Sequence, residues 1–348
     1  MTVTVTRRAA AISFSGAGTI VPCGPDETIL LAGLRAGLAL PYECASGGCG
    51  TCRAQLVEGS VTSRWDEATG LSARDRRKGD RILMCQSVPQ GGRCQVRVPI
   101  PDAQYPSGEP RPARVTGRLA ERELLTLDIA RFLVEVGQEL PYLPGQFVLL
   151  EFADGVRRAY SMSRPMHRER PGGLELLVRA KPGGAASRWL FDRLRAGAEV
   201  RVEGPYGKAY AQTPSERPVV CLAGGTGLAP VLAIAQQLVT DSPARRIDVY
   251  IGSRRAADIV LADRLGALAD CGARVIPVVE QNTDTEHPQL GRVRTGLALD
   301  HLARDWPDLS THDIYLAGPE PMIGATLRRL VRDGTASADR IFFDRFIS

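Results

Sequence analysis

The sequence predicts a multidomain chain in which an α+β segment, a small antiparallel barrel and a parallel α/β segment follow one another. Short strand-like runs flank a single short helical stretch in residues 1–100. Residues 113–216 contain strand-like runs separated by turn residues, as in small antiparallel barrels. From residue 217 onward, apolar strands alternate with helical stretches, and this order predicts a parallel sheet with helices on both faces.

Composition places the chain among ordinary globular proteins. It has 348 residues, of which 44% are hydrophobic and 24% are charged. No apolar run approaches the roughly 18 residues that a membrane span needs, and the first residues lack a signal-peptide core. We therefore expect a cytoplasmic protein with reduced thiols and no membrane partner. The net charge of +5 is too small to indicate nucleic-acid binding.

A proline-rich stretch marks the first domain boundary, because such a density of proline excludes helix and the interior of a sheet. The prediction is a first domain over 1–100, a linker over 101–112, a barrel over 113–216 and a last domain over 217–348. The first domain carries 12 Lys/Arg and 8 Asp/Glu. This excess of positive charge fits either an ordinary solvated surface or a docking site for an acidic partner.

In the first domain, residues 11–14 and 18–21 resemble a hairpin, and 27–36 a short helix closed by Gly37. A strand is expected over 53–57. Residues 64–80 are polar and expected to be irregular.

The cysteines of this segment form a motif. Cys44, Cys49 and Cys52 have the spacing C-x4-C-x2-C, and Cys85 follows at a distance. This is the plant-type 2Fe–2S pattern, in which four thiolates hold two irons. A zinc site more usually shows paired C-x2-C or Cys/His spacing, a disulfide framework suits short secreted chains, and scattered buried thiols would not cluster in this way. The pattern favours the iron–sulfur cluster.

Candidate strands of the barrel are 115–119, 125–129, 147–152 and 156–162. The last of them contains Arg158-Ala159-Tyr160-Ser161. On such a strand, Arg158 and Tyr160 share one face, so a guanidinium could bind a phosphate while the phenol ring stacks on a flat aromatic ligand. The alternative is an ordinary surface strand.

A glycine-containing turn follows at 181–187 and opens a helix expected to reach about Arg195. Gly184 and Ser187 belong to this turn. Glycines before a helix N-terminus provide a seat for an anion.

Two further turns lie after strands of the last domain. Gly225, Thr226 and Gly227 follow the apolar strand 219–223, and Gly318 with Met322 belongs to a turn after strand 314–317. Ligands bind beyond the carboxyl ends of parallel strands, where backbone N–H groups can hold a pyrophosphate. The alternative is a packing role for these glycines.

Taken in order, these motifs resemble the flavin and nicotinamide domains of the ferredoxin–NADP reductase superfamily, preceded by a plant-type ferredoxin domain of the β-grasp fold. The resemblance implies that Arg158 contacts flavin phosphate, Tyr160 packs on the isoalloxazine and Ser161 lies near N5. It implies that Gly184 and Ser187 bind the pyrophosphate of FAD. A Rossmann-like domain would bind the nicotinamide coenzyme through the two later turns, although Ala317 replaces the family's usual cysteine.

The choice of coenzyme depends on residues after strand 247–252. Arg254 and Arg255 could accept a 2′-phosphate, whereas Asp258 would repel one. The pattern resembles the NADH-using reductases, and we expect NADH. Phe346, near the end of the chain, is expected either to cover the flavin, as an aromatic residue does in related reductases, or to pack in the core.

Over nearly its full length, the chain is similar to the reductase component of multicomponent bacterial oxygenases. This implies electron transfer from NADH to FAD, then to the 2Fe–2S cluster, with Ser161, Tyr160 and Phe346 as catalytic residues. The acceptor would be a terminal oxygenase or hydroxylase component or an intermediate ferredoxin. Residues 70–76 resemble those of reductases that serve hydroxylases of aromatic compounds or alkenes, which implies a diiron hydroxylase, while Rieske dioxygenases also use such reductases. Two alternatives are a reductase serving a deoxysugar dehydratase and a redox sensor.

Overall fold

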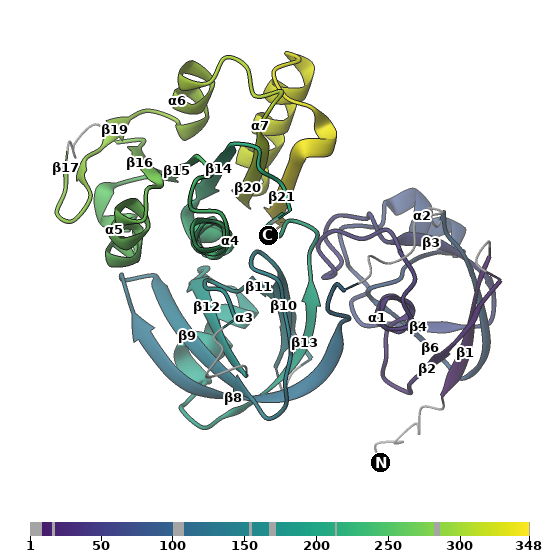
Figure 1. Cartoon of the computed structure of the whole chain (residues 1–348). Coiled ribbons are helices and arrows are strands. Elements are labelled where there is room, and N and C mark those ends of the chain that lie inside the picture. Colours follow the sequence, from purple (N-terminus) through teal and green to yellow (C-terminus); the bar gives the residue numbers. More distant parts are fainter. Residues whose placement is uncertain are drawn as a thin grey trace.

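The computed structural model describes residues 9–15, 18–99, 108–152, 155–166, 172–212, 214–281 and 286–347. These residues form three units with separate main sheets, which we call the N-terminal unit, the barrel and the α/β unit (Figure 1). The predicted fold class is confirmed. The expected linker over 101–112 lies largely outside the described residues.

The N-terminal unit has a mixed sheet in the order β2-β1-β7-β3-β5, in which β1 and β7 are parallel. Its elements are β1 (Ala10–Ser15), β2 (Ile20–Cys23), α1 (Ile29–Arg35), β3 (Arg53–Glu58), β4 (Val61–Ser63), α2 (Ala73–Lys78), β5 (Arg81–Leu83), β6 (Ser87–Pro89) and β7 (Gly92–Arg97). The Thr28 side chain accepts a hydrogen bond from the Leu31 N–H and starts α1, whose apolar residues are buried. The loop after α1 carries three of the motif cysteines.

The barrel is a six-stranded antiparallel sheet in the order β11-β10-β13-β8-β9-β12. Its elements are β8 (Ala113–Leu124), β9 (Ile129–Val136), β10 (Phe147–Glu151), β11 (Arg157–Ser161), β12 (Gly173–Arg179), α3 (Ala185–Ser187), the π-helical turn η1 (Arg188–Arg193) and β13 (Glu199–Tyr206). A bridge between Met162 and Leu176 joins the two sides.

One expectation for the barrel is wrong in detail. Residues 125–128 form the turn between β8 and β9 instead of a strand, because the Thr126 hydroxyl oxygen accepts from the N–H groups of Asp128 and Ile129. The helix after the glycine turn ends at Arg193, close to the expected Arg195, and changes from α to π geometry.

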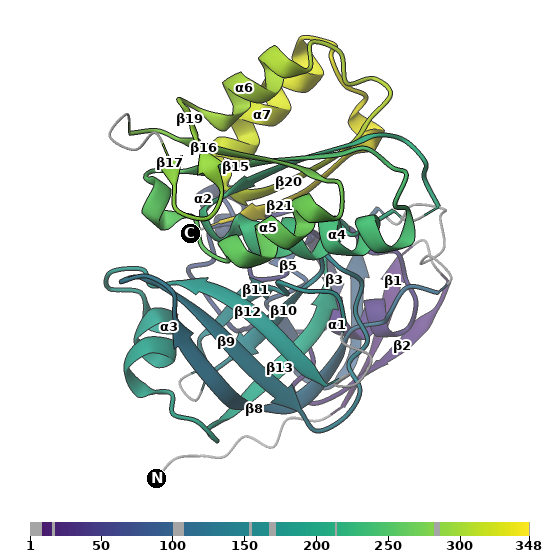
Figure 2. The ribbon, with the colours of Figure 1, turned by 60° about the vertical axis from the view of Figure 1, so that its left-hand side comes forward.

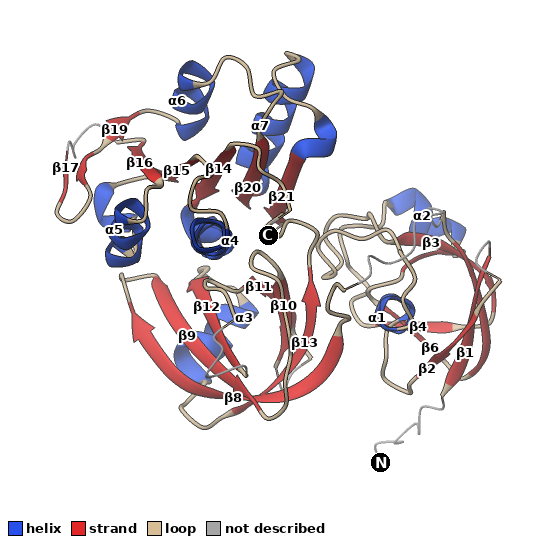
Figure 3. Cartoon of the chain, viewed as in Figure 1, coloured by secondary structure: helices blue, strands red, loops and turns tan. Residues whose placement is uncertain are grey.

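The α/β unit has a six-stranded parallel sheet in the order β19-β16-β15-β14-β20-β21 (Figure 3). Its strands are β14 (Val219–Gly224), β15 (Ile247–Ser253), β16 (Arg274–Val279), β19 (Arg294–Thr295), β20 (Asp313–Pro319) and β21 (Ile341–Phe346), and a separate pair is β17 (Glu286–His287) and β18 (Gly291–Arg292). Its helices are η2 (Gly225–Gly227), α4 (Leu228–Asp241), η3 (Ala256–Asp258), α5 (Ala262–Asp270), α6 (Ala298–Asp305), α7 (Glu320–Arg332) and η4 (Ala338–Arg340).

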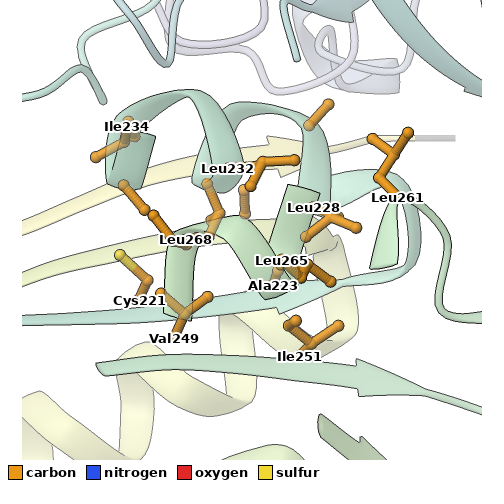
Figure 4. Packing of buried hydrophobic residues seen from close by; sticks show 14 of the residues in the cluster. Cys221, Ala223, Leu228, Leu232, Ile234, Val249, Ile251, Leu261, Leu265 and Leu268 are labelled. Carbon is orange, nitrogen blue, oxygen red and sulfur yellow. The ribbon is translucent and has the colours of Figure 1, made fainter. Parts of the chain in front are cut away.

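Helices cover both faces of this sheet, with α4 and α5 on one and α6 and α7 on the other (Figure 2). Figure 4 shows Leu232, Leu265 and Leu268 of α4 and α5 packing with Cys221 and Val249 of the sheet. This core fixes the carboxyl ends of β14 and β20 beside the barrel.

The three units pack directly against one another. Tyr206 of the barrel belongs to the core of the N-terminal unit, and its ring centroid lies 5.9 Å from that of Tyr42. Between the barrel and the α/β unit, Arg264 of α5 forms an ion pair of 2.6 Å with the buried Glu175 of β12. The chain's C-terminal end lies between the units (Figures 1 and 2).

Candidate functional site

A cavity of about 530 Å³ lies where the three units meet. Every unit contributes to its wall. The lining residues include Cys44 and Ser46 of the cysteine loop, residues 158–161 of β11, residues 181–187 of the glycine turn, Thr226 and Ala229 of the α/β unit, and residues 344–347 at the C-terminal end.

The four motif cysteines lie together in two pairs beside this cavity. The sulfurs of Cys52 and Cys85 are 3.2 Å apart, and the Cys49 N–H donates to the Cys44 sulfur at 3.4 Å. Hydrogen bonding by Cys49 lowers the pKa of Cys44 to about 5, and hydrogen bonding by Cys85 lowers the pKa of Cys52. The same hydrogen bonds raise the pKa of the other thiol of each pair, Cys49 and Cys85.

These pairs match the donor set of a binuclear cluster. In a 2Fe–2S cluster, four thiolates are shared between two irons, so two pairs of cysteines match the donor set. Cys44 faces the cavity, whereas Thr51, between Cys49 and Cys52, is exposed. The cysteine loop thus has one side toward the cavity and one toward solvent.

Strand β11 brings all four residues of the Arg-Ala-Tyr-Ser motif to the cavity wall. Arg158, Tyr160 and Ser161 line it directly, and the Arg158 guanidinium lies 5.7 Å from the ring centroid of Trp65 in the N-terminal unit. The cavity volume lies within the range of ligand sites, and its wall combines a cation, a phenol and a hydroxyl. These groups fit a flat aromatic ligand that carries phosphate.

The glycine turn forms another wall of the cavity. The Ser187 hydroxyl oxygen accepts a hydrogen bond from the Lys181 N–H at 2.7 Å, which closes the turn. A Cβ on Gly184 would lie 3.0 Å from the Lys181 carbonyl oxygen, so glycine suits this position. The Ser187 O–H remains available as a donor toward the cavity.

The two turns of the α/β unit meet because β14 and β20 are parallel neighbours. A Cβ on Gly227 would lie 2.1 Å from the Ala317 carbonyl oxygen, and Gly318 has a φ of 146° against the backbone of Gly224. Thr226 lines the cavity, whereas Met322 packs against Gly224. The carboxyl ends of β14 and β20, which face the cavity, therefore bring together Gly225, Thr226, Gly227 and Gly318.

Arg254 and Asp258 lie apart from the cavity, just beyond the carboxyl end of β15. The Asp258 carboxylate forms an ion pair of 3.0 Å with Arg255, and Arg254 is exposed. The charges of Arg255 and Asp258 thus neutralise each other.

Asp344 is a site residue that the sequence patterns did not reveal. The Ser161 hydroxyl donates to its carboxylate at 2.7 Å, and burial raises the pKa of Asp344 to about 6. Phe346 of the same strand lines the cavity. The available signal was the sequence of the last strand itself, in which Asp344 lies two residues before Phe346.

Comparison with known proteins agrees with this arrangement. Residues 12–90 match a family model described as a 2Fe-2S iron-sulfur cluster binding domain, residues 116–210 an oxidoreductase FAD-binding domain, and residues 221–328 an oxidoreductase NAD-binding domain. The ferredoxin–NAD(+) reductase component of an alkene monooxygenase system from Xanthobacter autotrophicus is 42% identical over 95% of this chain and 98% of its own length. The chain belongs to the ferredoxin–NAD(P)+ reductase components.

Other members of this reductase family are also similar. A ferredoxin–NAD(P)(+) reductase from Metapseudomonas resinovorans is 36% identical over 93% of this chain and 96% of its own length. The solved structure of the ferredoxin reductase in carbazole 1,9a-dioxygenase superposes with a TM-score of 0.85 at 32% identity, covering 97% of this chain and 99% of that chain. The predicted relationship to oxygenase reductases is confirmed.

The reductase is an NADH-dependent oxidoreductase with a 2Fe–2S cluster and FAD. When bound, FAD accepts a hydride from NADH and the cluster carries single electrons. No helix among the residues described here has both the length and the apolar character required to cross a membrane.

Proposed function

We propose that the protein supplies an oxygenase with electrons from NADH by way of FAD and a 2Fe–2S cluster. The observation that carries this proposal is the composition of one cavity wall. The same cavity of about 530 Å³ is lined by Cys44 of the cysteine loop, by Tyr160 and Ser161 of the barrel, and by Thr226 of the α/β unit. Sites for a hydride donor, a flavin and a one-electron carrier are thereby adjacent, as the reaction requires.

In this proposal, Cys44, Cys49, Cys52 and Cys85 hold the cluster. Arg158 binds flavin phosphate, Tyr160 packs on the flavin ring, Ser161 orients its reactive edge, and Gly184 and Ser187 bind the pyrophosphate. The nicotinamide coenzyme is held by Gly225, Thr226, Gly227, Gly318 and Met322, with its ribose near Arg254 and Asp258. Phe346 covers the flavin. The corresponding domains span 1–100, 113–216 and 217–348.

Among acceptors, we favour the hydroxylase component of a monooxygenase, either directly or through an intermediate ferredoxin. The support is the 42% identity to the reductase component of an alkene monooxygenase system, against 34% and 31% to reductase components of naphthalene 1,2-dioxygenase systems. A diiron hydroxylase is the expected type.

Use of NADH and the presence of free thiols favour a cytoplasmic location, which cell fractionation would test.

A cysteine replacement with a matched control tests the site assignment. Cys49→Ser should remove iron, sulfide and the visible absorption of the cluster, because one of four thiolates is lost. Flavin reduction by NADH should continue. Cys271→Ser, which replaces an exposed cysteine outside the motif, should change none of these properties. Unchanged iron and sulfide in Cys49→Ser would refute the assignment.

A further inference from the structure

The last residues of β21 contact both the cavity and the cysteine loop. Strand β21 pairs in parallel with β20. The last pair is Phe346 of β21 with Pro319 of β20, next to Gly318 at the carboxyl end of β20. Asp344 and Phe346 line the cavity beside Ser161. The strand therefore ends between the two units that carry the flavin and cluster sites.

Arg345 forms an ion pair with the residue that precedes the first motif cysteine. Its Nε lies 3.2 Å from Oε1 of Glu43, and both side chains are about three-quarters buried, with 25% and 22% exposed. Within the described part of the chain, neither atom has a hydrogen-bond partner, so the ion pair helps to compensate their burial. Arg345 also lies 4.0 Å from Glu320, and the Thr51 hydroxyl donates to the other carboxylate oxygen of Glu43. Screening by salt is weaker for such a pair than on an open surface.

Ile347 packs on the same loop. A Cβ placed on Gly48 would lie 2.7 Å from Cγ2 and 3.1 Å from Cβ of Ile347. Glu43 and Gly48 directly precede Cys44 and Cys49 in the chain. The C-terminal residues thus contact the loop immediately before each cysteine of this pair.

We propose that Arg345 and Ile347 are positioning residues. They hold the part of the cysteine loop that carries Cys44 and Cys49 against the flavin cavity. The inference rests on the proposed function, because it takes the cluster to be bound by this loop and the flavin by this cavity. Electron transfer from flavin to cluster depends on a fixed separation, and a small displacement of a bound group costs rate. The C-terminal strand sets this separation from outside the cluster-binding unit.

The ion pair is tested in the holoprotein with Arg345→Leu and Glu43→Gln. Each should slow reoxidation of reduced FAD by the cluster roughly five- to tenfold and speed backbone hydrogen exchange in residues 43–50. The double variant should be no slower than either single variant, and Arg345→Lys should recover most of the rate. Arg332→Gln removes an equally charged side chain that is 80% exposed at the end of α7, and it should have no effect.

The packing contact allows an independent test that does not remove charge. Gly48→Ala should displace Ile347 and slow the same step, because the three atoms nearest to the added methyl group all belong to that side chain. Adding Ile347→Ala should make room for the methyl group and restore both the rate and the exchange protection.

Iron and FAD content are measured in every variant. Unchanged flavin-to-cluster rates and unchanged exchange in Arg345→Leu and Gly48→Ala, with full cofactor content, would overturn the positioning role and leave the proposed function intact. A wild-type protein that binds neither iron nor flavin would instead overturn the proposed function, and the positioning role with it.

Discussion

Ser161 and Asp344 show how single side chains from distant parts of the chain shape the cavity. The Ser161 hydroxyl has a rotatable proton, and the Asp344 carboxylate fixes its direction by accepting it at 2.7 Å. An ionised carboxylate can only accept, whereas a protonated carboxyl group can also donate its O–H to the Ser161 oxygen. The raised pKa of Asp344 therefore makes the orientation of the Ser161 hydroxyl sensitive to pH.

We predict that the rate of flavin reduction by NADH decreases as the pH falls through about 6, because a protonated Asp344 can donate to the Ser161 oxygen and no longer fixes the direction of its hydroxyl hydrogen. Asp344→Asn should remove this step from the pH profile, whereas Asp339→Asn, at an exposed acid before the same strand, should keep it. The measurement is stopped-flow flavin bleaching between about pH 5 and about pH 8. A step that persists in Asp344→Asn would contradict the assignment.

The titration of Asp344 affects the stability of the fold in the opposite direction from its effect on the rate. Since the folded state holds the Asp344 proton more tightly than the unfolded chain, the contribution of this group to the free energy of unfolding decreases as the pH rises from its ordinary pKa of 3.8 to about 6.

We expect coenzyme choice to depend on single residues as well. Asp258→Ala should release Arg255 and remove a negative charge near the expected ribose site, so that kcat/KM for NADPH rises roughly tenfold relative to NADH. Steady-state kinetics with both coenzymes measure the ratio. Asp270→Ala, at an exposed acid at the end of α5, is the control and should leave it unchanged. An unchanged ratio in Asp258→Ala would show that this acid does not discriminate.

Residues that lie close together in the sequence were the predictable part of the site. The cysteines of the loop, the Arg-Ala-Tyr-Ser strand and the glycine turns each form a local pattern with a physical purpose. Asp344 and Ser161 are 183 residues apart, and no local pattern connects them. Their contact arises from parallel pairing of β20 and β21, which places the C-terminal end at the cavity.

At the scale of elements, the turn between β14 and α4 depends on close approach of two backbones. Gly227 packs against the carbonyl of Ala317 because the parallel strands end side by side. A side chain here would separate the two turns that are proposed to hold the coenzyme.

Gly227→Ala should therefore raise KM for NADH roughly tenfold or more, since its Cβ would lie 2.1 Å from the Ala317 oxygen and the turn must shift. Gly266→Ala in α5 meets nothing within 4 Å and should leave KM unchanged while stabilising the helix by about 0.5–1 kcal/mol. Kinetics and thermal unfolding compare the two. Normal NADH kinetics in Gly227→Ala would contradict the proposed role of the turn.

Helix α2 shows what the sequence patterns concealed at this scale. Residues 64–80 were expected to be irregular because they are polar, yet Ala73–Lys78 form a helix with no buried residue. The signal was a capping box, in which Ser72 caps the Asp75 N–H and Asp75 returns to the Ser72 N–H. Periodicity failed here because the helix is stabilised by its ends and has no apolar face.

At the scale of the whole molecule, the central feature is a cavity shared by all three units. Each unit was predictable from its own pattern of strands and helices. Their junction was not, because it depends on contacts such as Arg264 with Glu175 and Tyr42 with Tyr206, which join segments far apart in the chain. Those contacts fix the cysteine loop, β11 and the sheet edge around one space.

Anaerobic rapid mixing of the purified protein with NADH tests the central claim most directly. The account predicts that flavin absorbance at first decreases, and that the absorbance and electron paramagnetic resonance signal of a reduced 2Fe–2S cluster then develop within the same polypeptide. In Cys49→Ser the first phase should remain and the second should be absent. Cluster reduction that precedes or bypasses the flavin, or that persists in Cys49→Ser, would contradict the account.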